Sequence, residues 1–459
     1  MNTRHLTPRA AIVATVLAAG AVGLFALGCA RPTAQQHTDA APEPTPGPAP
    51  DGITQTDGQP GKPSATPGNT DHIMFGGTPD RNMVNPKEKL EKFPTKGPNW
   101  NDEEDVKKWS AQWVLWRQDL GSRAYSGPVI AGGKVFVGTN NERPRNKRDI
   151  GKNMAGELEP IDKGILMCFD EKTGKFLWQA VHDKLPSGQV HDWPKEGLCS
   201  TPLVEGSRIY YVSNQCRVVC ADVDGLANGN DGPFKSEKYT DPTDVDIIWE
   251  YDMMRELDVF PHNMSACSPL VVGDVLYIVT ANGVDEGHIN IPSPEAPSFI
   301  ALDKTTGKLI WKSNAPGRNI MHGQWSNPVY AEIGGVKQVI FPGGDGKLHS
   351  FTPDKGEPLW EFDCNPKKSV YELGGTGTRS DFIGTPVVYD GKVYIGVGQD
   401  PEHTTGIGHF WCINPAGKKG DISPTLATGQ KDKDGLPEEK PNPNSGLVWT
   451  YGGEEKRDY

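Results

Sequence analysis

Residues 299–311 read Phe299-Ile-Ala-Leu-Asp-Lys-Thr-Thr-Gly-Lys-Leu-Ile-Trp311: an apolar run, an acidic turn with glycine, and a second apolar run that ends in tryptophan. Two apolar runs around a glycine-containing turn predict a pair of short antiparallel strands. The aspartate can cap the turn, the glycine supplies a positive φ, and the indole can cover the seam between neighbouring sheets. Close copies occupy residues 166–178 and 348–360, and looser copies occupy residues 219–225 with 247–249 and residues 411–417 with 447–449.

A second pattern precedes each of these copies along the chain. It consists of a small polar residue, a proline, an apolar strand, a turn that contains glycine, and a second apolar strand, which together predict a hairpin. The five copies are Ser126-Gly-Pro to Gly138, Ser200-Thr-Pro to Val212, Ser268-Pro to Val279, Ser326-Asn-Pro to Phe341 and Gly384-Thr-Pro to Ile395. A complete unit therefore holds four short antiparallel strands.

Tandem four-stranded units predict an all-β fold, a β-propeller of four-stranded antiparallel blades. Five blades are recognisable, and Trp113–Gln118, interpreted as a stray closing strand, adds part of a sixth. Only ten residues follow the closing strand 447–449, so we expect a ring that is incomplete at its C-terminal end. The chain has 54 Gly and 40 Pro among 459 residues, a composition that favours short strands and turns and excludes an all-helical protein.

Ala301-Leu-Asp-Lys-Thr-Thr-Gly-Lys-Leu-Ile-Trp311 is similar to the Ala-x-Asp-x-x-Thr-Gly-x-x-x-Trp signature of the pyrroloquinoline-quinone (PQQ)-type propeller repeat, also called quinoprotein-alcohol-dehydrogenase-like. The likeness extends over residues 110–450 and implies a propeller that usually has seven or eight blades. That family includes cofactor-dependent dehydrogenases, the propeller lipoprotein of the outer-membrane β-barrel assembly machine, and other secreted proteins. Fold alone does not choose among these functions.

Two features bear on whether the chain is an enzyme. Quinone dehydrogenases of the family often carry two adjacent cysteines beside the cofactor, and no adjacent pair occurs in this sequence. They also hold a calcium ion and a catalytic aspartate, which cannot be matched to residues here. We therefore predict a non-catalytic scaffold that binds a protein or a ligand, with no resident cofactor. The alternative is a PQQ-dependent periplasmic oxidoreductase, which would require PQQ and calcium.

The N-terminal region predicts three segments. Arg4, His5 and Arg9 precede an apolar stretch that ends at Cys29, and residues 1–29 resemble a bacterial lipoprotein signal, which implies lipidation of that cysteine. An uncleaved membrane anchor or a plain signal is the competing interpretation. Residues 30–75 are rich in Pro, Gly, Thr and Gln with few large apolar residues, so we expect a disordered tether. Residues 76–459 form the propeller domain.

The charge of the chain limits its partners. Lys and Arg total 47 against 59 Asp and Glu, for a formal net charge of −12, which would repel a nucleic-acid backbone. Together with the signal, this predicts a lipid-anchored protein of the bacterial cell envelope that faces the periplasm or the exterior. Its partner would be an envelope protein or a small ligand, and the membrane would be contacted through the lipid.

The repeat positions of the cysteines predict that several of them are buried between the sheets. Seven cysteines remain after Cys29, and Cys168, Cys220 and Cys412 occupy the position that Ala301 has in its own copy, so we interpret them as buried packing residues. Cys199 and Cys267 both lie shortly before a proline-led strand in adjacent units. They are the pair whose repeat positions bring them closest, and a disulfide between them is left open.

The candidate binding face is built by loops. In propellers, the loop that enters each innermost strand and the loop between the second and third strands share one face, around the mouth of the central channel. Convergence of polar side chains there is what a ligand site needs, although exposed loops are polar in any case. The entering loops of five successive units carry Arg123, His191, Asp192, His262, Asn263, His322, Arg379 and Asp381.

Other residues of these loops are candidate metal ligands or stacking groups. We predict no metal site, and the candidates for one are the carboxylates Asp285, Glu286, Asp400 and Glu402, with His288 and His403 as neighbouring nitrogen ligands. Trp193, Trp325 and Phe382 lie beside the polar residues, where they either stack on a planar ligand or pack beneath the loops.

Overall fold

The structure is a computed structural model that describes residues 71–83, 96–99, 101–371, 377–399 and 407–453. The chain divides into Met1–Pro67 and Gly68–Tyr459, and all described residues belong to the second unit. The signal with Cys29, and the tether up to residue 70, lie outside the described residues. Neither of the two helices among the described residues is long and apolar enough to cross a membrane.

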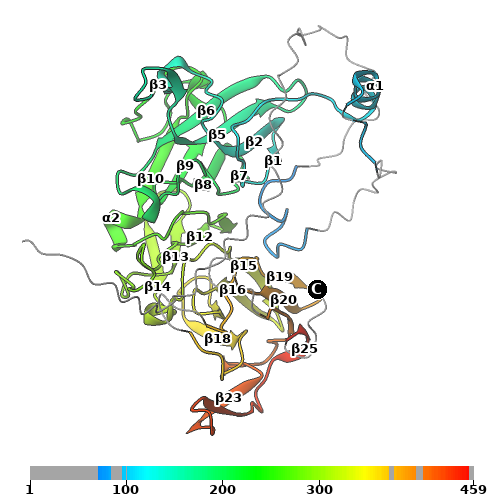
Figure 1. Ribbon diagram of the computed structural model, residues 1–459, viewed down its shortest axis with the longest axis vertical. Helices are drawn as coiled ribbons and strands as arrows, with labels where there is room; N and C mark the ends of the chain where they lie inside the picture. The colour runs from blue at the N-terminus through cyan, green and yellow to red at the C-terminus, as the bar shows by residue number, and fades with distance from the viewer. Residues whose placement is uncertain (1–70, 84–95, 100, 372–376, 400–406, 454–459) are drawn as a thin grey trace, which may run out of the picture. The chain divides into compact units, whose positions relative to one another are not determined.

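Five sheets follow one another along the chain, each with four antiparallel strands in sequence order (Figure 1). The first three are β1 (Val129–Ala131), β2 (Lys134–Asn140), β5 (Lys163–Asp170) and β6 (Phe176–Asp183); β7 (Leu203–Glu205), β8 (Arg208–Val212), β9 (Arg217–Asp222) and β10 (Ile247–Asp252); and β11 (Leu270–Val272), β12 (Val275–Val279), β13 (Phe299–Asp303) and β14 (Leu309–Ser313).

The last two sheets have the same order, and one of them is extended. They are β15 (Val329–Ile333), β16 (Val336–Pro342), β17 (Lys347–Phe351) and β18 (Pro358–Asp363), with β22 (Gly420–Asp421) added in parallel; and β19 (Val387–Tyr389), β20 (Lys392–Val397), β21 (His409–Ile413) and β25 (Leu447–Gly452). The predicted all-β propeller architecture of four-stranded antiparallel blades is confirmed, and each predicted hairpin and turn lies at its predicted place.

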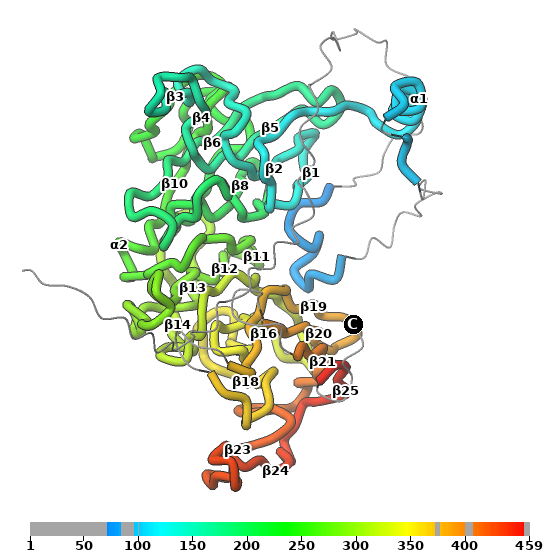
Figure 2. Tube along the Cα trace, in the orientation of Figure 1, coloured from blue at the N-terminus to red at the C-terminus, as the bar shows by residue number. Residues whose placement is uncertain are grey.

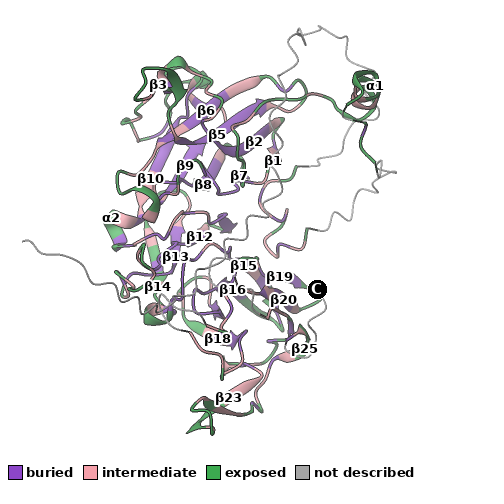
Figure 3. Cartoon of the chain, viewed as in Figure 1, coloured by how far each residue is buried: buried purple, intermediate pink, exposed green. Residues whose placement is uncertain are grey.

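Two of the blades carry insertions between their strands. Two hairpins, β3 (Ile150–Lys152) with β4 (Leu158–Pro160) and β23 (Thr425–Lys431) with β24 (Pro437–Pro441), extend from the first and last blades. The helices are α1 (Glu103–Trp113), whose N-terminus is capped by Asp102, and the short α2 (Met253–Leu257). Burial is concentrated in the blade strands, whereas the β3 hairpin and α1 are largely exposed (Figure 3).

The apolar core lies in the seams between successive sheets. One cluster joins Phe136 and Leu166 of the first sheet to Tyr211 and Val219 of the second, and a second cluster joins the second, third and fourth sheets. A third cluster joins the fourth sheet to the fifth. Because each of the three middle sheets packs against a neighbour on both faces, the repeat is stabilised by contacts between adjacent units.

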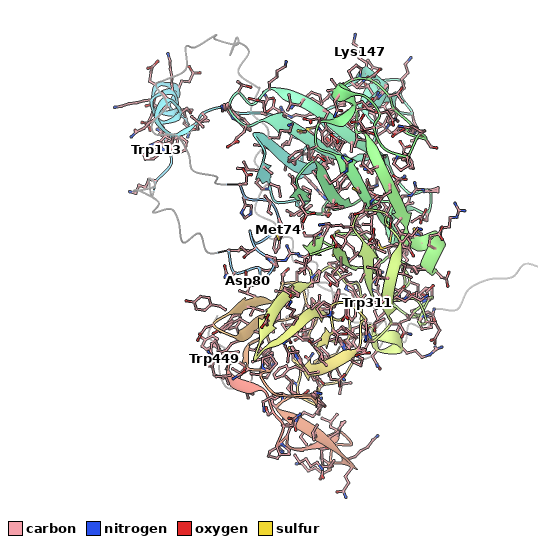
Figure 4. All side chains as sticks on the ribbon, turned by 180° about the vertical axis from the view of Figure 1, so that it is seen from behind. Met74, Asp80, Trp113, Lys147, Trp311 and Trp449 are labelled. Carbon is pink, nitrogen blue, oxygen red and sulfur yellow. The ribbon has the colours of Figure 1, made fainter. Side chains whose placement is uncertain are left out.

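Tryptophans cover these seams as the sequence predicts. The closing-strand indoles of three blades each donate a hydrogen bond from Nε1 to a carbonyl in the acidic turn of the next blade. The pairs are Trp178 to Val223 at 2.9 Å, Trp249 to Lys304 at 3.2 Å and Trp311 to Pro353 at 2.9 Å. Figure 4 labels Trp311 on its strand.

The stray closing strand predicted at Trp113–Gln118 is wrong as secondary structure. Trp113 is the last residue of α1, and residues 114–118 form no ladder. The Trp116 indole nevertheless occupies the seam position on the first blade, since its Nε1 donates to the Glu171 carbonyl at 2.6 Å and its ring lies over Gly174. The side-chain contact is kept without the strand because described residues provide no neighbouring strand with which residues 114–118 could pair.

The segment of residues 71–83 lies against the first strands of all five blades. His72 pairs with Ile130 of β1, and the Ile73 carbonyl accepts from Val204 of β7 at 2.8 Å. The carbonyls of Pro79 and Asp80 accept from β15 and β19, each at 2.9 Å. Arg81 reaches the third blade through the Ser268 and Pro269 carbonyls. The segment, drawn in blue in Figure 2 and labelled at Met74 and Asp80 in Figure 4, therefore links the inner strands of the blades.

Candidate functional site

A cavity of 570 Å³ opens where the loops that enter the inner strands meet. Its wall combines large apolar side chains with a few neutral polar groups and one carboxylate. The large apolar and charged side chains of the lining are Phe75, Tyr125, Trp193, Glu196, Met264, Trp325 and Ile383. They come from the segment 71–83 and from the entering loops of all five blades.

Two of the eight predicted face residues are part of this wall or touch it. Asn263 lines the cavity, and its backbone N–H and carbonyl bond to Val190 and Trp193, each at 2.7 Å. Arg123 forms an ion pair with Glu196, whose carboxylate lies in the lining. Desolvation, and then the Glu196 carboxylate, raise the pKa of the Tyr125 hydroxyl. The charge of the cavity lining is thus concentrated at Glu196.

Four of the predicted face residues do not line the cavity but make contacts within and between the loops. The Asp192 carboxylate pairs with Lys184 and accepts from Asn214 at 2.8 Å, and burial raises its pKa despite the lysine. The His191 ring packs edge-on against Phe260, and burial lowers its pKa. Arg379 donates to Asp363 at 2.8 Å, and the backbone of Asp381 pairs with Gly398. These contacts hold the entering loops in place.

The remaining two, His262 and His322, lie together with a third histidine, His288. One ring nitrogen of each lies within 4.8 Å of those of the other two. The ring centroids are 4.5 Å apart for His262 and His322, 4.8 Å for His262 and His288, and 4.7 Å for His288 and His322. His262 and His322 are buried and His288 is partly buried. The sequence predicts His262 and His322 on one face, but it does not predict that His288 lies beside them.

The carboxylates considered as metal ligands do not form a site. Asp285 accepts from the backbone N–H groups of Ile289 and Asn290 and from the Asn290 amide, so it holds its own loop. Glu286 accepts from Gln189 at 2.9 Å. Asp400, Glu402 and His403 lie outside the described residues. Within the described ranges, the histidine trio is the one group of three or more side chains that could hold a metal ion.

One described cysteine, Cys199, lines the cavity. All seven described cysteines are free thiols and all are buried, including Cys168, Cys220 and Cys412, which confirms their interpretation as packing residues. The disulfide left open between Cys199 and Cys267 is not formed. Burial raises the pKa of both thiols to about 12, so neither is a thiolate near neutral pH.

The cavity does not fit PQQ, the cofactor that the quinoprotein resemblance implies. PQQ is a planar tricarboxylate and needs cationic or multiple hydrogen-bond donors around its carboxylates. The described lining contains no lysine or arginine, and its one charged side chain is the carboxylate of Glu196. Calcium prefers six to eight oxygen ligands, whereas the one group of three or more His, Cys, Asp or Glu ligands among the described residues consists of imidazoles. We therefore derive no chemistry from either group.

Comparison with known proteins gives a family and several relatives. The model of the family described as outer membrane protein assembly factor BamB matches residues 106–230 and 239–412, well over half of the chain. A quinoprotein ethanol dehydrogenase from Pseudomonas putida is 29% identical over 121 residues, which are 25% of this chain and 18% of the relative.

Similar solved structures match the chain at low identity. A quinohemoprotein alcohol dehydrogenase from Comamonas testosteroni has a TM-score of 0.46 at 11% identity, over 82% of this chain and 52% of that one. BamB from Moraxella catarrhalis has a TM-score of 0.29 at 14% identity, over 69% of this chain and 88% of that one. The chain thus spans about half the length of the dehydrogenase structure and a smaller share of the curated dehydrogenase. On the extent of the family match and the five tandem sheets, the chain belongs to the family of the outer membrane protein assembly factor BamB.

Proposed function

We propose that the protein is a non-catalytic scaffold of the bacterial envelope that binds another protein through the cavity at its looped face. The observation that carries this proposal is the lining of the cavity. Tyr125, Trp193 and Trp325, from three different blades, surround one concavity together with Met264 and Ile383. Aromatic and methionine side chains are typical of the centres of protein interfaces, where they receive apolar anchors of the partner.

The chemistry of the wall favours an apolar segment of a protein over a charged small molecule. Tyr125 and Ile383 are 63% and 55% exposed, so two large side chains are available for contact at the rim. The single charged group, Glu196, is already paired with Arg123. A partner with an apolar anchor flanked by neutral hydrogen-bonding groups would match this surface, whereas a polyanion would find no cation in the described lining.

The family supports the same class of function. The name of the matched family describes a factor of outer membrane protein assembly, which is a role carried out among proteins of the envelope. The lipoprotein-type signal ending at Cys29 would hold the propeller at a membrane through the tether predicted at residues 30–75. That tether would end before His72, because His72 pairs with Ile130 and Met74 is buried in the core. Replacing Cys29 by serine should release the protein from the membrane fraction if the lipid is its anchor; retention of Cys29→Ser in that fraction would contradict lipid anchoring.

The proposal is tested by photocrosslinking in cells with the full-length protein. A benzoylphenylalanine placed at Tyr125 or Ile383 should form a discrete adduct with a partner protein. Tyr389 is the matched control, because it is 61% exposed but is the last residue of β19, at the end of that strand opposite to its entering loop. Trp193→Ala should reduce the Tyr125 adduct. Equal adducts at Tyr125 and Tyr389, or none at Tyr125 and Ile383, would overturn the assignment of this face.

Mixing the purified protein with PQQ and calcium tests the oxidoreductase alternative. We expect neither a bound-quinone absorbance spectrum nor reduction of an artificial electron acceptor. Stoichiometric quinone binding that Glu196→Gln strengthens would instead place the cofactor in this cavity and refute the non-catalytic assignment.

A further inference from the structure

His262, His288 and His322 come from three loops that the fold brings to one point. His262 lies in the loop that enters β11, His288 lies in the loop between β12 and β13, and His322 lies in the loop that enters β15. From this convergence we propose that the three imidazoles bind one divalent transition-metal ion, Zn²⁺ or Cu²⁺. The site is distinct from the proposed protein-binding function and does not depend on it.

The hydrogen bonding of His262 prepares it as a ligand. Its Nδ1 lies 2.8 Å from the Val284 carbonyl oxygen. Because a carbonyl only accepts, Nδ1 carries the hydrogen, and Nε2 holds a lone pair in the neutral ring. This arrangement, in which the second ring nitrogen of a ligand histidine donates to a backbone carbonyl, is the usual outer-shell support of a metal-bound imidazole.

The distances between the rings suit a single ion. Four-coordinate zinc has Zn–N distances of about 2.0–2.1 Å, which places two ligand nitrogens about 3.3 Å apart. The Nε2 atoms of His262 and His288 are 3.1 Å apart, and all three ligand atoms lie within 4.8 Å of one another. Small rotations of the side chains would bring the third nitrogen into the same sphere. In the absence of an ion, the 3.1 Å contact corresponds to a hydrogen bond donated by the His288 ring.

The loops that carry the histidines are fixed to one another by backbone hydrogen bonds. The His262 N–H donates to Ala281 and the Val284 N–H donates to His322, each at 3.2 Å. Between them, Gly283 permits a close approach that no other residue would allow, because a Cβ there would lie 2.6 Å from the His262 Cβ and 2.7 Å from the His322 carbonyl oxygen. Two of the three ligands are therefore held by a rigid, tightly packed junction.

The third ligand is placed by a turn that Asp285 organises. The His288 N–H donates to the Asp285 carbonyl at 3.0 Å, and His288 itself adopts φ +56°, in the left-handed region that side chains other than glycine rarely occupy. The Asp285 carboxylate accepts hydrogen bonds from the backbone N–H groups of Ile289 and Asn290, which follow His288. A strained backbone that directs a polar side chain into a cluster is typical of functional sites.

The ligand set selects the class of metal. Three imidazole nitrogens suit zinc and copper, whereas calcium and magnesium require oxygen ligands. Three protein ligands also leave a fourth position for water or a small anion, as in zinc sites with an exchangeable ligand. The Trp325 ring packs edge-on against His322, with centroids 5.0 Å apart, and its Nε1 donates to the His262 carbonyl at 3.2 Å. This indole covers one side of the trio.

The test is metal binding by the full-length protein, measured with Zn²⁺, Cu²⁺ and Co²⁺ separately after removal of bound metal with a chelator. We expect one equivalent of Zn²⁺ or Cu²⁺ to bind, a tetrahedral d–d spectrum with Co²⁺, and nitrogen scatterers at about 2.0 Å in the X-ray absorption of the zinc form. Calcium and magnesium should not compete. Failure of all three transition metals to bind stoichiometrically would overturn the proposal and leave the trio as a hydrogen-bonded cluster.

Variants separate loss of a ligand from loss of the fold. His262→Asn keeps a donor for the Val284 carbonyl but removes Nε2, and should weaken metal binding by at least about 100-fold. His288→Asn is the second variant, because His288 is only partly buried and its replacement should leave the circular dichroism and melting temperature unchanged while affinity falls. His72→Gln, which changes an exposed histidine elsewhere, is the control. Unchanged affinity in a folded His288→Asn protein, or sulfur scatterers at about 2.3 Å, would assign the metal to other residues.

Discussion

The indole of Trp178 lies directly on Gly225, so that a Cβ built on the glycine would be 2.8 Å from the Trp178 Cγ. The same relationship joins Trp249 to Gly307, and Trp311 to Gly356, at 2.6 and 2.5 Å. In each case the glycine belongs to the acidic turn of the following blade and has a positive φ. One residue type therefore serves both the turn and the seam, which explains why the Asp-to-Gly turn and the Trp recur together in the sequence.

Gly307→Ala should destabilise the protein more than Gly273→Ala. Both glycines lie in the third blade with φ of +70° and +60°, but a Cβ on Gly273 meets nothing within 4 Å whereas one on Gly307 meets the Trp249 ring. The left-handed backbone alone costs about 1–2 kcal/mol for an L-residue, and the overlap should add about 1–3 kcal/mol to the loss in the free energy of unfolding. Urea unfolding of the two variants measures the difference. Equal midpoints would show that the indole yields without cost.

Trp178→Ala should lower the free energy of unfolding by about 3–5 kcal/mol, because the side chain is 1% exposed and fills the seam between the first two blades. Trp449→Ala is the matched control. It is the closing-strand tryptophan of the last blade and is 44% exposed, so its replacement should change stability by less than about 1 kcal/mol. Thermal unfolding monitored by circular dichroism compares the two. Similar losses would mean that burial in the seam is not what makes these tryptophans stabilising.

The blades could be predicted from sequence because each carries its own local signals. A Pro-led strand, a turn and a Trp-terminated strand specify hairpins without reference to distant residues, and five copies in tandem then specify how the sheets pack. The hairpins β1–β2 and β13–β14 lie where their copies predict them. Local signals were not enough at Trp116. Its indole lies in the expected seam, but a strand around it would need neighbouring strands, which the local sequence does not specify.

The interior of the propeller and the histidine trio could not be predicted in the same way. Residues 71–83 show no alternating apolar pattern. Their hydrogen bonds go to β1, β7, β15 and β19 and, through Arg81, to the residues just before β11, all of them distant in sequence. His262 and His322 were placed on one face because they hold equivalent positions before inner strands. His288 lies in the loop between β12 and β13, outside the repeated strand and turn patterns, so only the fold of that loop brings it to the other two.

Arg81 should be the residue that holds the segment 71–83 in place. Its side chain is completely buried, and its guanidinium donates to the carbonyls of Pro328 at 3.1 Å, Ser268 at 3.2 Å and Pro269 at 3.0 Å, as well as to Phe75. Arg81→Met would leave these buried carbonyls without their donor and should cost about 3–5 kcal/mol of stability.

Chymotrypsin cleavage after Phe75 provides the second readout for Arg81. The bond is protected while the segment lies against the inner strands, so Arg81→Met should be cleaved faster than the unchanged protein under native conditions. Arg318→Met is the control, because the Arg318 side chain is 75% exposed and its only described ion pair is with the exposed Glu295. An Arg81→Met protein that resists chymotrypsin as well as the control would show that the backbone hydrogen bonds alone hold the segment.

His182 should make the protein less stable in mild acid. It is 5% exposed, its Nε2 lies 3.0 Å from the Tyr211 hydroxyl oxygen, and burial, followed by the charge of Arg217 and opposed by Asp183, lowers its pKa to about 4. Because the unfolded chain, with a histidine pKa near 6.5, takes up this proton and the folded protein does not, stability is complete above pH 6.5. It is lost as the pH falls to 4, by about 3 kcal/mol from this group. Urea midpoints of the unchanged protein and of His182→Gln, which keeps a polar partner for Tyr211, should converge over this range; parallel curves would show that His182 is protonated without cost in the folded state.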